Sequence, residues 1–155
     1  MSDALQLLLA ERDIARALAA FARAMDARDW GALDALLAPD AAADFGTGEV
    51  SGRAAIVGVM RSFLDDCGPT QHLLGNLTVE VDAGGTTARS RCYVSDLHLG
   101  SGAHAALTFQ TLGEYQDSWA CRDGRWWLTR RVKLNRAHLG SFAVLGPGPA
   151  GWSPQ

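Results

Sequence analysis

The sequence predicts an α+β fold in which three N-terminal helices pack against one face of a strongly curved, mostly antiparallel sheet. Through most of the first 64 positions, apolar residues recur at three- and four-residue intervals, as on one side of a helix. From residue 70 onward, apolar and polar residues alternate in long segments separated by glycine-containing turns, as in antiparallel strands. A bent sheet capped by helices forms a cone-shaped α+β barrel with a blind pocket inside.

The first helix is expected over residues 5–28. Its apolar side chains recur at helical spacing, and charged residues occupy the other directions. Its many alanines add helix propensity. The apolar side is formed by Ile14, Leu18, Phe21 and Met25.

Two shorter helices are expected to follow the first. Asp29 is a typical N-cap residue in front of a helix over 30–37, which the proline at position 39 would stop. Short extended segments are expected over 41–45 and 48–51, around a Gly-Thr-Gly turn. The third helix is expected over 53–64, and a Gly-Pro pair closes the segment after it.

Four long strands complete the predicted domain. The turn before the last strand contains Asp-Gly, which is typical of a hairpin. Residues 1–140 are expected to form one domain, and the Gly/Pro-rich tail 141–155 is expected to lie irregularly over it. The predicted strands span 70–81, 86–99, 103–121 and 126–138.

Composition excludes several classes of function. The 155 residues suit one domain, with 48% hydrophobic and 20% charged residues. The formal net charge of -3, with both signs interspersed, argues against nucleic-acid or anionic-membrane partners. Neither a signal peptide nor a membrane-spanning stretch is expected. Cys67, Cys92 and Cys121 fit neither a disulfide framework nor a zinc site, so we expect a cytoplasmic protein with reduced thiols.

Asp26 and His72 are the strongest candidates for chemistry. Asp26 comes near the end of the first predicted helix, and His72 opens the first long strand. An imidazole and a carboxylate that meet inside a fold make a base and a group that orients it, which is the minimum for proton abstraction. The alternatives are a solvated aspartate near a helix end and a packed or exposed histidine.

A second histidine and an arginine are further candidates. Antiparallel pairing across the turn at 82–85 should bring His98 beside His72. Two histidines and an aspartate resemble a metal set, but no metal-binding spacing supports one, and neither metal nor cofactor is expected. Arg130 and Arg131 are adjacent in a strand, so one of them faces the helices and needs an anionic or carbonyl partner there. Which one does so depends on whether a bulge intervenes.

Over about residues 8–140, the chain resembles the SnoaL-like branch of the nuclear transport factor 2-like superfamily. This group is similar in architecture to scytalone dehydratase, ketosteroid isomerase, bile-acid 7α-dehydratase and hexachlorocyclohexane dehydrochlorinase. The order and spacing of five short features carry the resemblance. They are Ala-Phe-Ala-Arg-Ala-Met-Asp26, Asp29-Trp30, Gly52-Arg53-Ala-Ala-Ile56, Thr70-Gln-His72 with Asn76, and Gly124-Arg-Trp126-Trp-Leu128 with Arg131.

The resemblance implies a cofactor-independent lyase of the dehydratase or cyclase type, acting on a small apolar or polycyclic molecule. In such members the histidine matching His72 removes a proton, and the aspartate matching Asp26 holds its tautomer. His98 matches the second histidine of scytalone dehydratase, and Arg131 matches the pocket arginine of the dehydrochlorinase. The pocket lining expected here comprises Phe21, Phe45, Met60, Leu74 and Tyr93.

The chain departs from scytalone dehydratase where that enzyme carries phenols that polarise its substrate. Met25 and Phe45 stand at those positions here, which leaves Tyr93 and Tyr115 as candidate hydroxyl donors. If the proton returned to another carbon, the same residues would make an isomerase like ketosteroid isomerase. The alternative of another class is a non-catalytic ligand-binding module, or one like the small subunits of ring-hydroxylating oxygenases. Either way, the open sheet face favours a homodimer or homotrimer.

Overall fold

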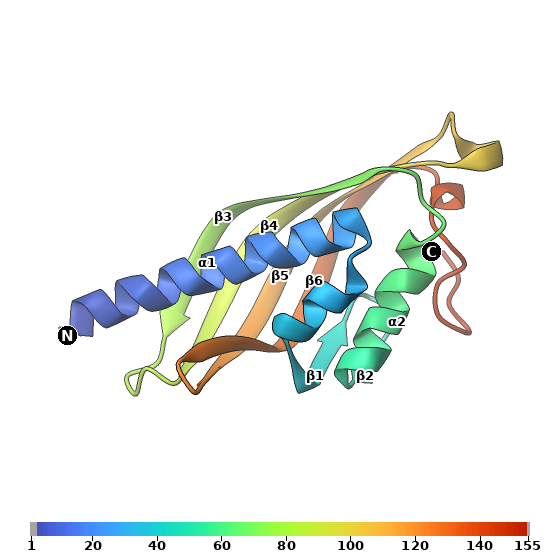
Figure 1. The fold of residues 1–155 in the computed structure, drawn as a ribbon. Coiled ribbons are helices and arrows are strands. Elements are labelled where there is room, and N and C mark those ends of the chain that lie inside the picture. Colours follow the sequence, from blue (N-terminus) through green and yellow to red (C-terminus); the bar gives the residue numbers. More distant parts are fainter. Residues whose placement is uncertain (1–2, 155) are drawn as a thin grey trace.

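The computed structural model describes residues 3–154 and shows an α+β fold with helices on one side of a curved sheet (Figure 1). The helical layer comprises α1 (Asp3–Ala27), the 3₁₀ helix η1 (Trp30–Ala35) and α2 (Arg53–Leu64). The strands are β1 (Leu37–Asp44), β2 (Glu49–Ser51), β3 (Thr70–Val81), β4 (Thr87–Leu99), β5 (Thr108–Arg122) and β6 (Arg125–Gly140). Two further 3₁₀ turns are η2 (Gly102–His104) and η3 (Phe142–Val144).

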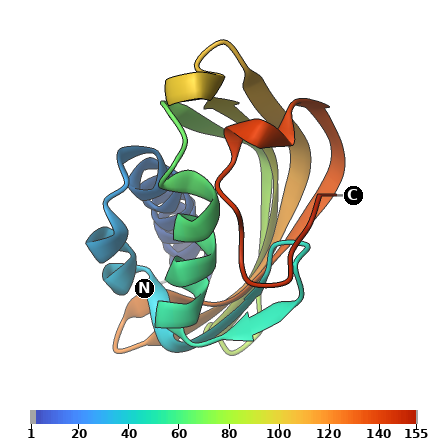
Figure 2. The ribbon, with the colours of Figure 1, turned by 90° about the vertical axis from the view of Figure 1, so that its right-hand side faces the viewer.

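The six strands form one sheet in the order β2-β1-β6-β5-β4-β3. Every neighbouring pair is antiparallel except β1 and β6, which run parallel. The sheet remains open between its edge strands β2 and β3, and it curves around the helices (Figure 2). The predicted fold class, three helices on a curved and mostly antiparallel sheet, is confirmed.

The α1 helix lies on the concave face because one of its sides is apolar. The four residues expected to form that side are at most 3% exposed, and α1 makes most of its sheet contacts with β3. The helix ends where Arg28 adopts a left-handed conformation (φ 56°), which is uncommon for a residue with a side chain. This ending sets Asp26 beside the start of β3, because Arg28 donates to the Gly68 carbonyl just before that strand (3.2 Å) and Asp26 accepts the His72 amide within it (3.0 Å).

Two boundaries differ from the expected ones. The second helix is a 3₁₀ helix that ends at Ala35, and the strand after it starts at Leu37 rather than at residue 41. Pro39 lies inside β1, in the irregular stretch of the ladder between Leu37 and Ala42, where its missing N–H interrupts no regular pairing. Similarly, η2 occupies 102–104, so the third long strand begins at Thr108.

The C-terminal segment after β6 folds back over α2 (Figure 2). The Gly146 amide donates to the Phe63 carbonyl (2.8 Å), and the Gly148 amide donates to the Ser62 carbonyl (3.2 Å). The rings of Phe63 and Trp152 meet edge to face, with centroids 4.8 Å apart. The segment therefore forms a wall over the open end of the helix–sheet sandwich.

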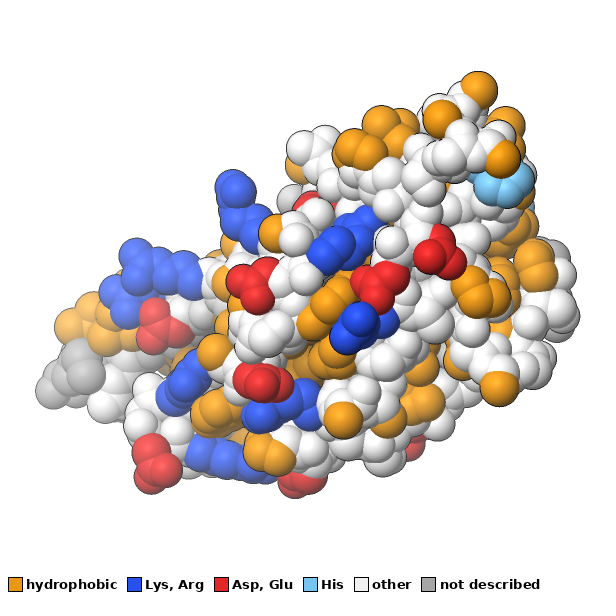
Figure 3. All heavy atoms as spheres, turned by 45° about the vertical axis from the view of Figure 1, so that its right-hand side comes forward, with side chains coloured by type: hydrophobic (Ala, Val, Ile, Leu, Met, Phe, Trp, Pro, Cys, Tyr) orange, Lys and Arg blue, Asp and Glu red, His pale blue; other side chains and the backbone are white. Residues whose placement is uncertain are grey.

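Acidic and basic side chains are interspersed over the face shown in Figure 3. This distribution agrees with the mild net charge of the sequence. Among residues 3–154, no helix combines the length and the hydropathy needed to cross a membrane.

Candidate active site

A cavity of about 1040 Å³ lies between the sheet, α2 and the C-terminal segment. Its wall combines aromatic and aliphatic side chains with polar ones, among them a compact group from β3, β4, β5 and β6. The apolar part includes Met25, Phe45, Met60, Phe63, Phe109, Phe142 and Trp152. The polar group includes His72, Asp96, His98, Thr111 and Lys133.

Asp26 and His72 are in direct contact at this wall. His72 Nδ1 lies 2.6 Å from Asp26 Oδ1, and the His72 backbone amide donates to Asp26 Oδ2 at 3.0 Å. The side chains of Asp26 and His72 are 23% and 4% exposed, respectively. Because an ionised carboxylate only accepts hydrogen bonds, Nδ1 must carry the proton of a neutral His72. The lone pair then resides on Nε2, on the far side of the ring from Asp26.

Arg28 and Thr70 extend this arrangement. The Thr70 hydroxyl donates to Asp26 Oδ1 (2.9 Å) and accepts from the Arg28 guanidinium (2.9 Å). Arg28 also donates to the carbonyls of Met25 (2.7 Å) and Leu64 (2.9 Å), so it ties the end of α1 to the end of α2. Burial opposes ionisation of Asp26, but the hydrogen bonds from His72 and Thr70 outweigh it and lower the pKa of the carboxyl.

Asp96 and Lys133 form a second ion pair at the same wall. The Lys133 ammonium contacts Asp96 Oδ2 and lies 3.1 Å from the Thr111 hydroxyl oxygen. That hydroxyl donates to Asp96 Oδ1, which also accepts the Thr111 amide at 3.0 Å. Burial opposes ionisation of Asp96, but Lys133 and Thr111 lower its pKa. His72 Nε2 is 3.9 Å from Asp96 Oδ2, so the two polar groups adjoin.

His98 lies beside His72, as antiparallel pairing predicts, with ring centroids 5.5 Å apart. His98 Nδ1 is 3.2 Å from the Phe109 carbonyl, which can only accept, so Nδ1 is the protonated nitrogen. Burial lowers the pKa of His98 to about 4, while Asp96 acts in the opposite direction. His98 is therefore uncharged at neutral pH.

His72, Asp96 and His98 also offer a potential metal-ligand set, with ligand atoms within 4.8 Å of one another. Both histidines have Nδ1 anchored, which is the usual second contact of a metal-bound histidine. Both oxygens of Asp96, however, already accept from Thr111 or Lys133. A divalent ion would have to displace the ammonium, so the geometry favours Lys133 as the cation on Asp96.

Arg131, expected to reach the substrate, does not line the cavity. A bulge between the pairs Ser118–Arg130 and Trp119–Leu128 turns Arg131 inward, where it is 2% exposed. Its guanidinium makes two 2.8 Å hydrogen bonds to Asp117. Its carbon Cζ lies 4.3 Å from the ring centroid of Phe21 and 3.9 Å from that of Tyr115. The arginine expectation is thus corrected: these contacts use the guanidinium to join α1 to the sheet.

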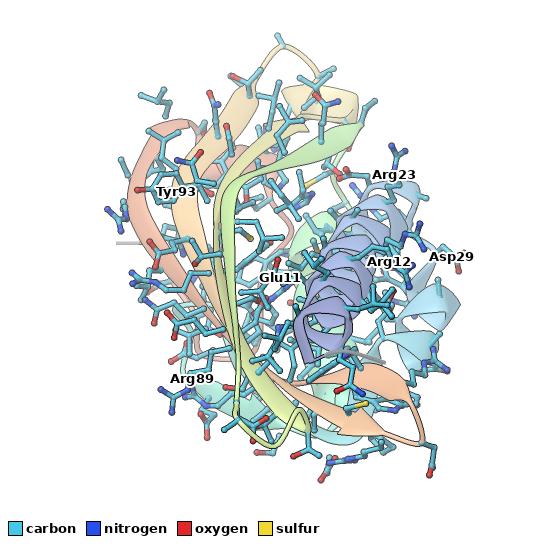
Figure 4. The ribbon with its side chains drawn as sticks, turned by 90° about the vertical axis from the view of Figure 1, so that its left-hand side faces the viewer. Glu11, Arg12, Arg23, Asp29, Arg89 and Tyr93 are labelled. Atoms are coloured by element: carbon cyan, nitrogen blue, oxygen red, sulfur yellow. The ribbon has the colours of Figure 1, made fainter. Side chains whose placement is uncertain are left out.

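Tyr93, expected in the pocket, lies on the opposite face of the sheet (Figure 4). It is 50% exposed, whereas Asp96 and His98 on the same strand are buried. Side chains alternate along β4, and Tyr93 stands an odd number of residues from both of those buried positions. Phe45 and Met60 do line the cavity. Phe21 and Leu74, by contrast, pack in the core outside its wall.

Sequence reasoning missed the pair formed by Asp96 and Lys133, and also Thr111. A signal was present, because Lys133 is the only lysine in a chain with 14 basic residues. It stands two positions after Arg131, so both share the face that the bulge selects. Asp96 likewise precedes His98 by two positions.

Comparisons with known proteins agree with this architecture. A hexachlorocyclohexane dehydrochlorinase, LinA-type3 of Novosphingobium barchaimii, shares 18% identity and a TM-score of 0.78, over 99% of this chain and 100% of its own. A provisionally named scytalone dehydratase of Novosphingobium aromaticivorans shares 19% identity and a TM-score of 0.74, over 96% and 98%. A Mycobacterium tuberculosis protein of unknown function, Rv3472 (D26N), shares 22% identity and a TM-score of 0.72, over 83% and 77%.

These likenesses establish the cone-like fold that the chain shares with its structural neighbours. The search of curated proteins gave no significant match. The family model for the SnoaL-like domain matches residues 6–132, which is most of the chain. On that match, and with the fold in agreement, the chain belongs to the SnoaL-like domain family.

Proposed function

We propose that this protein is a cofactor-independent lyase of the dehydratase type, in which His72 removes a proton from carbon and Asp26 holds the imidazole. The observation that carries the proposal is the 2.6 Å contact between His72 Nδ1 and Asp26 Oδ1 at the wall of the cavity. A base held by a carboxylate is a recurrent device for proton abstraction.

The surroundings of the pair suit that role. Asp26 accepts from the ring and the backbone of His72, so the ring has one orientation and one favoured tautomer. When Nε2 gains a proton, the adjacent carboxylate stabilises the imidazolium. The aromatic and aliphatic part of the wall suits a small, largely apolar substrate.

The names of two structural neighbours, a dehydrochlorinase and a dehydratase, denote eliminations and support the lyase class. An isomerase would use the same base and return the proton to a different carbon of the substrate.

We also propose a cytoplasmic location, which the three unpaired cysteines of the chain support.

Hydrogen–deuterium exchange tests the proposal whichever product the reaction forms. The protein is incubated in D₂O with β-hydroxy ketones, cyclic enones and chlorinated cyclohexanes, and NMR follows exchange at carbon and release of water or chloride. We expect exchange or elimination with one of these classes, and a loss of about 100-fold or more in His72→Gln.

His104→Gln is the matched control, because His104 is exposed and does not line the cavity. It should keep the wild-type rate. If His72→Gln turned over as fast as the wild type, the lyase proposal would fail. A ligand-binding module, the alternative from another class, would bind members of the panel with equal affinity in both variants and convert none.

A further inference from the structure

Lys133 is placed to act on a bound molecule. It is the only lysine of the chain, and it projects from β6 to the cavity wall with 13% of its side chain exposed. Holding a lone ammonium in such a site requires compensation, which Asp96 supplies from a position that is 1% exposed. The chain thus maintains a buried ion pair at the wall of the cavity.

The ammonium retains hydrogen-bonding capacity. A lysine ammonium has three N–H donors, and among residues 3–154 two acceptors contact it, Asp96 Oδ2 and Thr111 Oγ1. One donor remains for a ligand in the cavity. Thr111 also fixes Asp96 through its amide and hydroxyl, so the carboxylate that positions Lys133 is itself held in place.

The position of this donor relative to His72 is suited to a carbonyl compound. His72 Nε2 and Lys133 Nζ both approach Asp96 Oδ2, the former at 3.9 Å. A carbonyl oxygen is two bonds away from its α-carbon. A substrate in the cavity can therefore direct an α-hydrogen to the imidazole and its oxygen to the ammonium.

Three other cationic or ionisable groups at or near the cavity are less suited to hold a developing negative charge. His98 uses its N–H on the Phe109 carbonyl and is neutral. Arg131 is bound to Asp117 outside the cavity wall. Arg136 reaches Glu114 (2.8 Å) and is 57% exposed, so water screens its charge.

We propose that Lys133 binds the oxygen of a carbonyl substrate and stabilises the enolate formed when His72 removes the α-proton, with Asp96 and Thr111 as its positioning residues. The proposal rests on the function proposed above and narrows its substrate to β-hydroxy carbonyl compounds. Lys133 supplies the oxyanion donor that Met25 and Phe45 cannot provide.

The reaction balances with these groups alone. The α-carbon–hydrogen bond breaks, its proton moves to His72 Nε2, and its electron pair forms the enolate, whose oxygen accepts a hydrogen bond from Lys133. The enolate then re-forms the carbonyl as the bond to the β-hydroxyl breaks. That hydroxyl takes the proton back from His72 and leaves as water. Lys133 stays protonated throughout, and the product is the α,β-unsaturated carbonyl compound.

Binding of 4-nitrophenol tests the oxygen site without turnover. The phenolate imitates an enolate oxygen, and its visible absorbance reports its ionisation. Titration of the bound probe should show the phenolate bound about tenfold or more tightly than the phenol, as expected for a hydrogen bond between charged groups. The preference should persist in His72→Gln, which removes the base but keeps the ammonium.

The preference should disappear in Lys133→Met and remain in Arg130→Met, which removes an exposed positive charge from the same strand. Because Lys133→Met leaves Asp96 buried without its cation, the double variant Asp96→Asn/Lys133→Met is measured alongside it. Circular dichroism verifies that each variant is folded. Tyr115 also lines the cavity and is the rival donor, so Tyr115→Phe should keep the preference if Lys133 carries it. Loss of the preference in Tyr115→Phe alone would assign the oxygen site to the tyrosine hydroxyl.

An unchanged phenolate preference in both lysine variants would overturn the oxygen site, as would failure of the wild type to bind the probe. These outcomes are independent of the lyase test. If the phenolate preference depends on Lys133 but His72→Gln keeps its turnover, the oxygen site at Lys133 stands and the role of His72 as base fails. If His72→Gln loses turnover but Lys133 has no role in phenolate binding, the base stands and the oxygen site fails.

Discussion

In the proposed mechanism, Asp26 orients the His72 ring as well as stabilising its charge. Its two oxygens accept from the ring and the backbone of His72, and Thr70, held by Arg28, adds a third donor. These contacts lower the pKa of the Asp26 carboxyl against the opposing effect of burial. The sequence could predict the two residue types, but not the hydrogen-bond network that sets the tautomer of His72.

The substitution Asp26→Asn isolates that network. An amide in place of the carboxylate can present its NH₂ group to Nδ1 and favour the tautomer in which Nε2 carries the proton. We expect turnover in the exchange assay to fall by about 100-fold or more, with the fold retained by circular dichroism. Wild-type turnover in Asp26→Asn would show that the carboxylate does not prepare the base.

His98 should make the stability of the protein fall in mild acid. Its pKa drops from 6.5 to about 4 on folding, chiefly through burial. Between these values the unfolded state binds the proton that the folded state does not, so stability decreases as pH falls through that window. Urea unfolding should show a loss of about 2 kcal/mol between pH 7 and pH 5.

The same titration of His98→Gln supplies the control. Removing the imidazole removes its contribution to the pH dependence, so most of the loss between pH 7 and pH 5 should disappear. An equal loss in this variant and the wild type would assign the acid sensitivity to other groups.

Among the secondary-structure elements, β6 is the strand whose side-chain directions depart most from strict alternation. A single bulge determines that Arg131 faces α1 and that Arg130 faces solvent, where it pairs with Glu49 at 2.6 Å. The Arg131–Asp117 pair is buried on both sides, with side-chain exposures of 2% and 1%. Loss of the partner carboxylate should therefore lower the free energy of unfolding much more for Arg131 than for Arg130.

The matched substitutions Asp117→Asn and Glu49→Gln test this difference. Removing the carboxylate from Arg131 leaves a buried charge without compensation and should lower the free energy of unfolding by about 3–5 kcal/mol. The exposed pair should contribute no more than about 1 kcal/mol. Chemical denaturation measures both, and similar losses in the two variants would refute the structural role given to Arg131.

The element boundaries also show what sequence patterns can and cannot specify. The apolar stripe of α1 and the alternation in β3 to β6 are long enough to predict those elements. By contrast, β1 depends on parallel pairing with β6, about 90 positions away, and tolerates Pro39 because the ladder is interrupted there. Pairing between distant strands, rather than local propensity, determines these boundaries. Such pairing also determines the bulge in β6, which sets the face on which Lys133 lies.

For the whole molecule, the outer face of the sheet is the main surface left uncovered by helices (Figure 2). Four large apolar side chains are exposed along three adjacent strands of this face, which is a patch typical of subunit contacts. They are Leu73 (59% exposed), Tyr93 (50%), Leu97 (39%) and Leu112 (46%). We propose that a second or third copy of the chain covers them.

Light scattering coupled to size-exclusion chromatography tests the assembly. The wild type should have the mass of a dimer or trimer, and Leu112→Glu should reduce it to the monomer while leaving 4-nitrophenol binding intact. Leu8→Glu, which changes an exposed leucine on α1, should leave the assembly unchanged. A monomeric wild type at micromolar concentration would contradict this assignment of the outer face.

The proposed proton abstraction by His72 requires one particular tautomer of its ring, and ¹⁵N NMR of the histidine side chains measures that tautomer directly. The His72 signals are identified by their loss in His72→Gln. In the neutral ring, we predict that Nδ1 carries the proton towards Asp26 and that Nε2 is unprotonated. A proton on Nε2, or tautomers that exchange freely as in unconstrained imidazole, would contradict the role given to the pair.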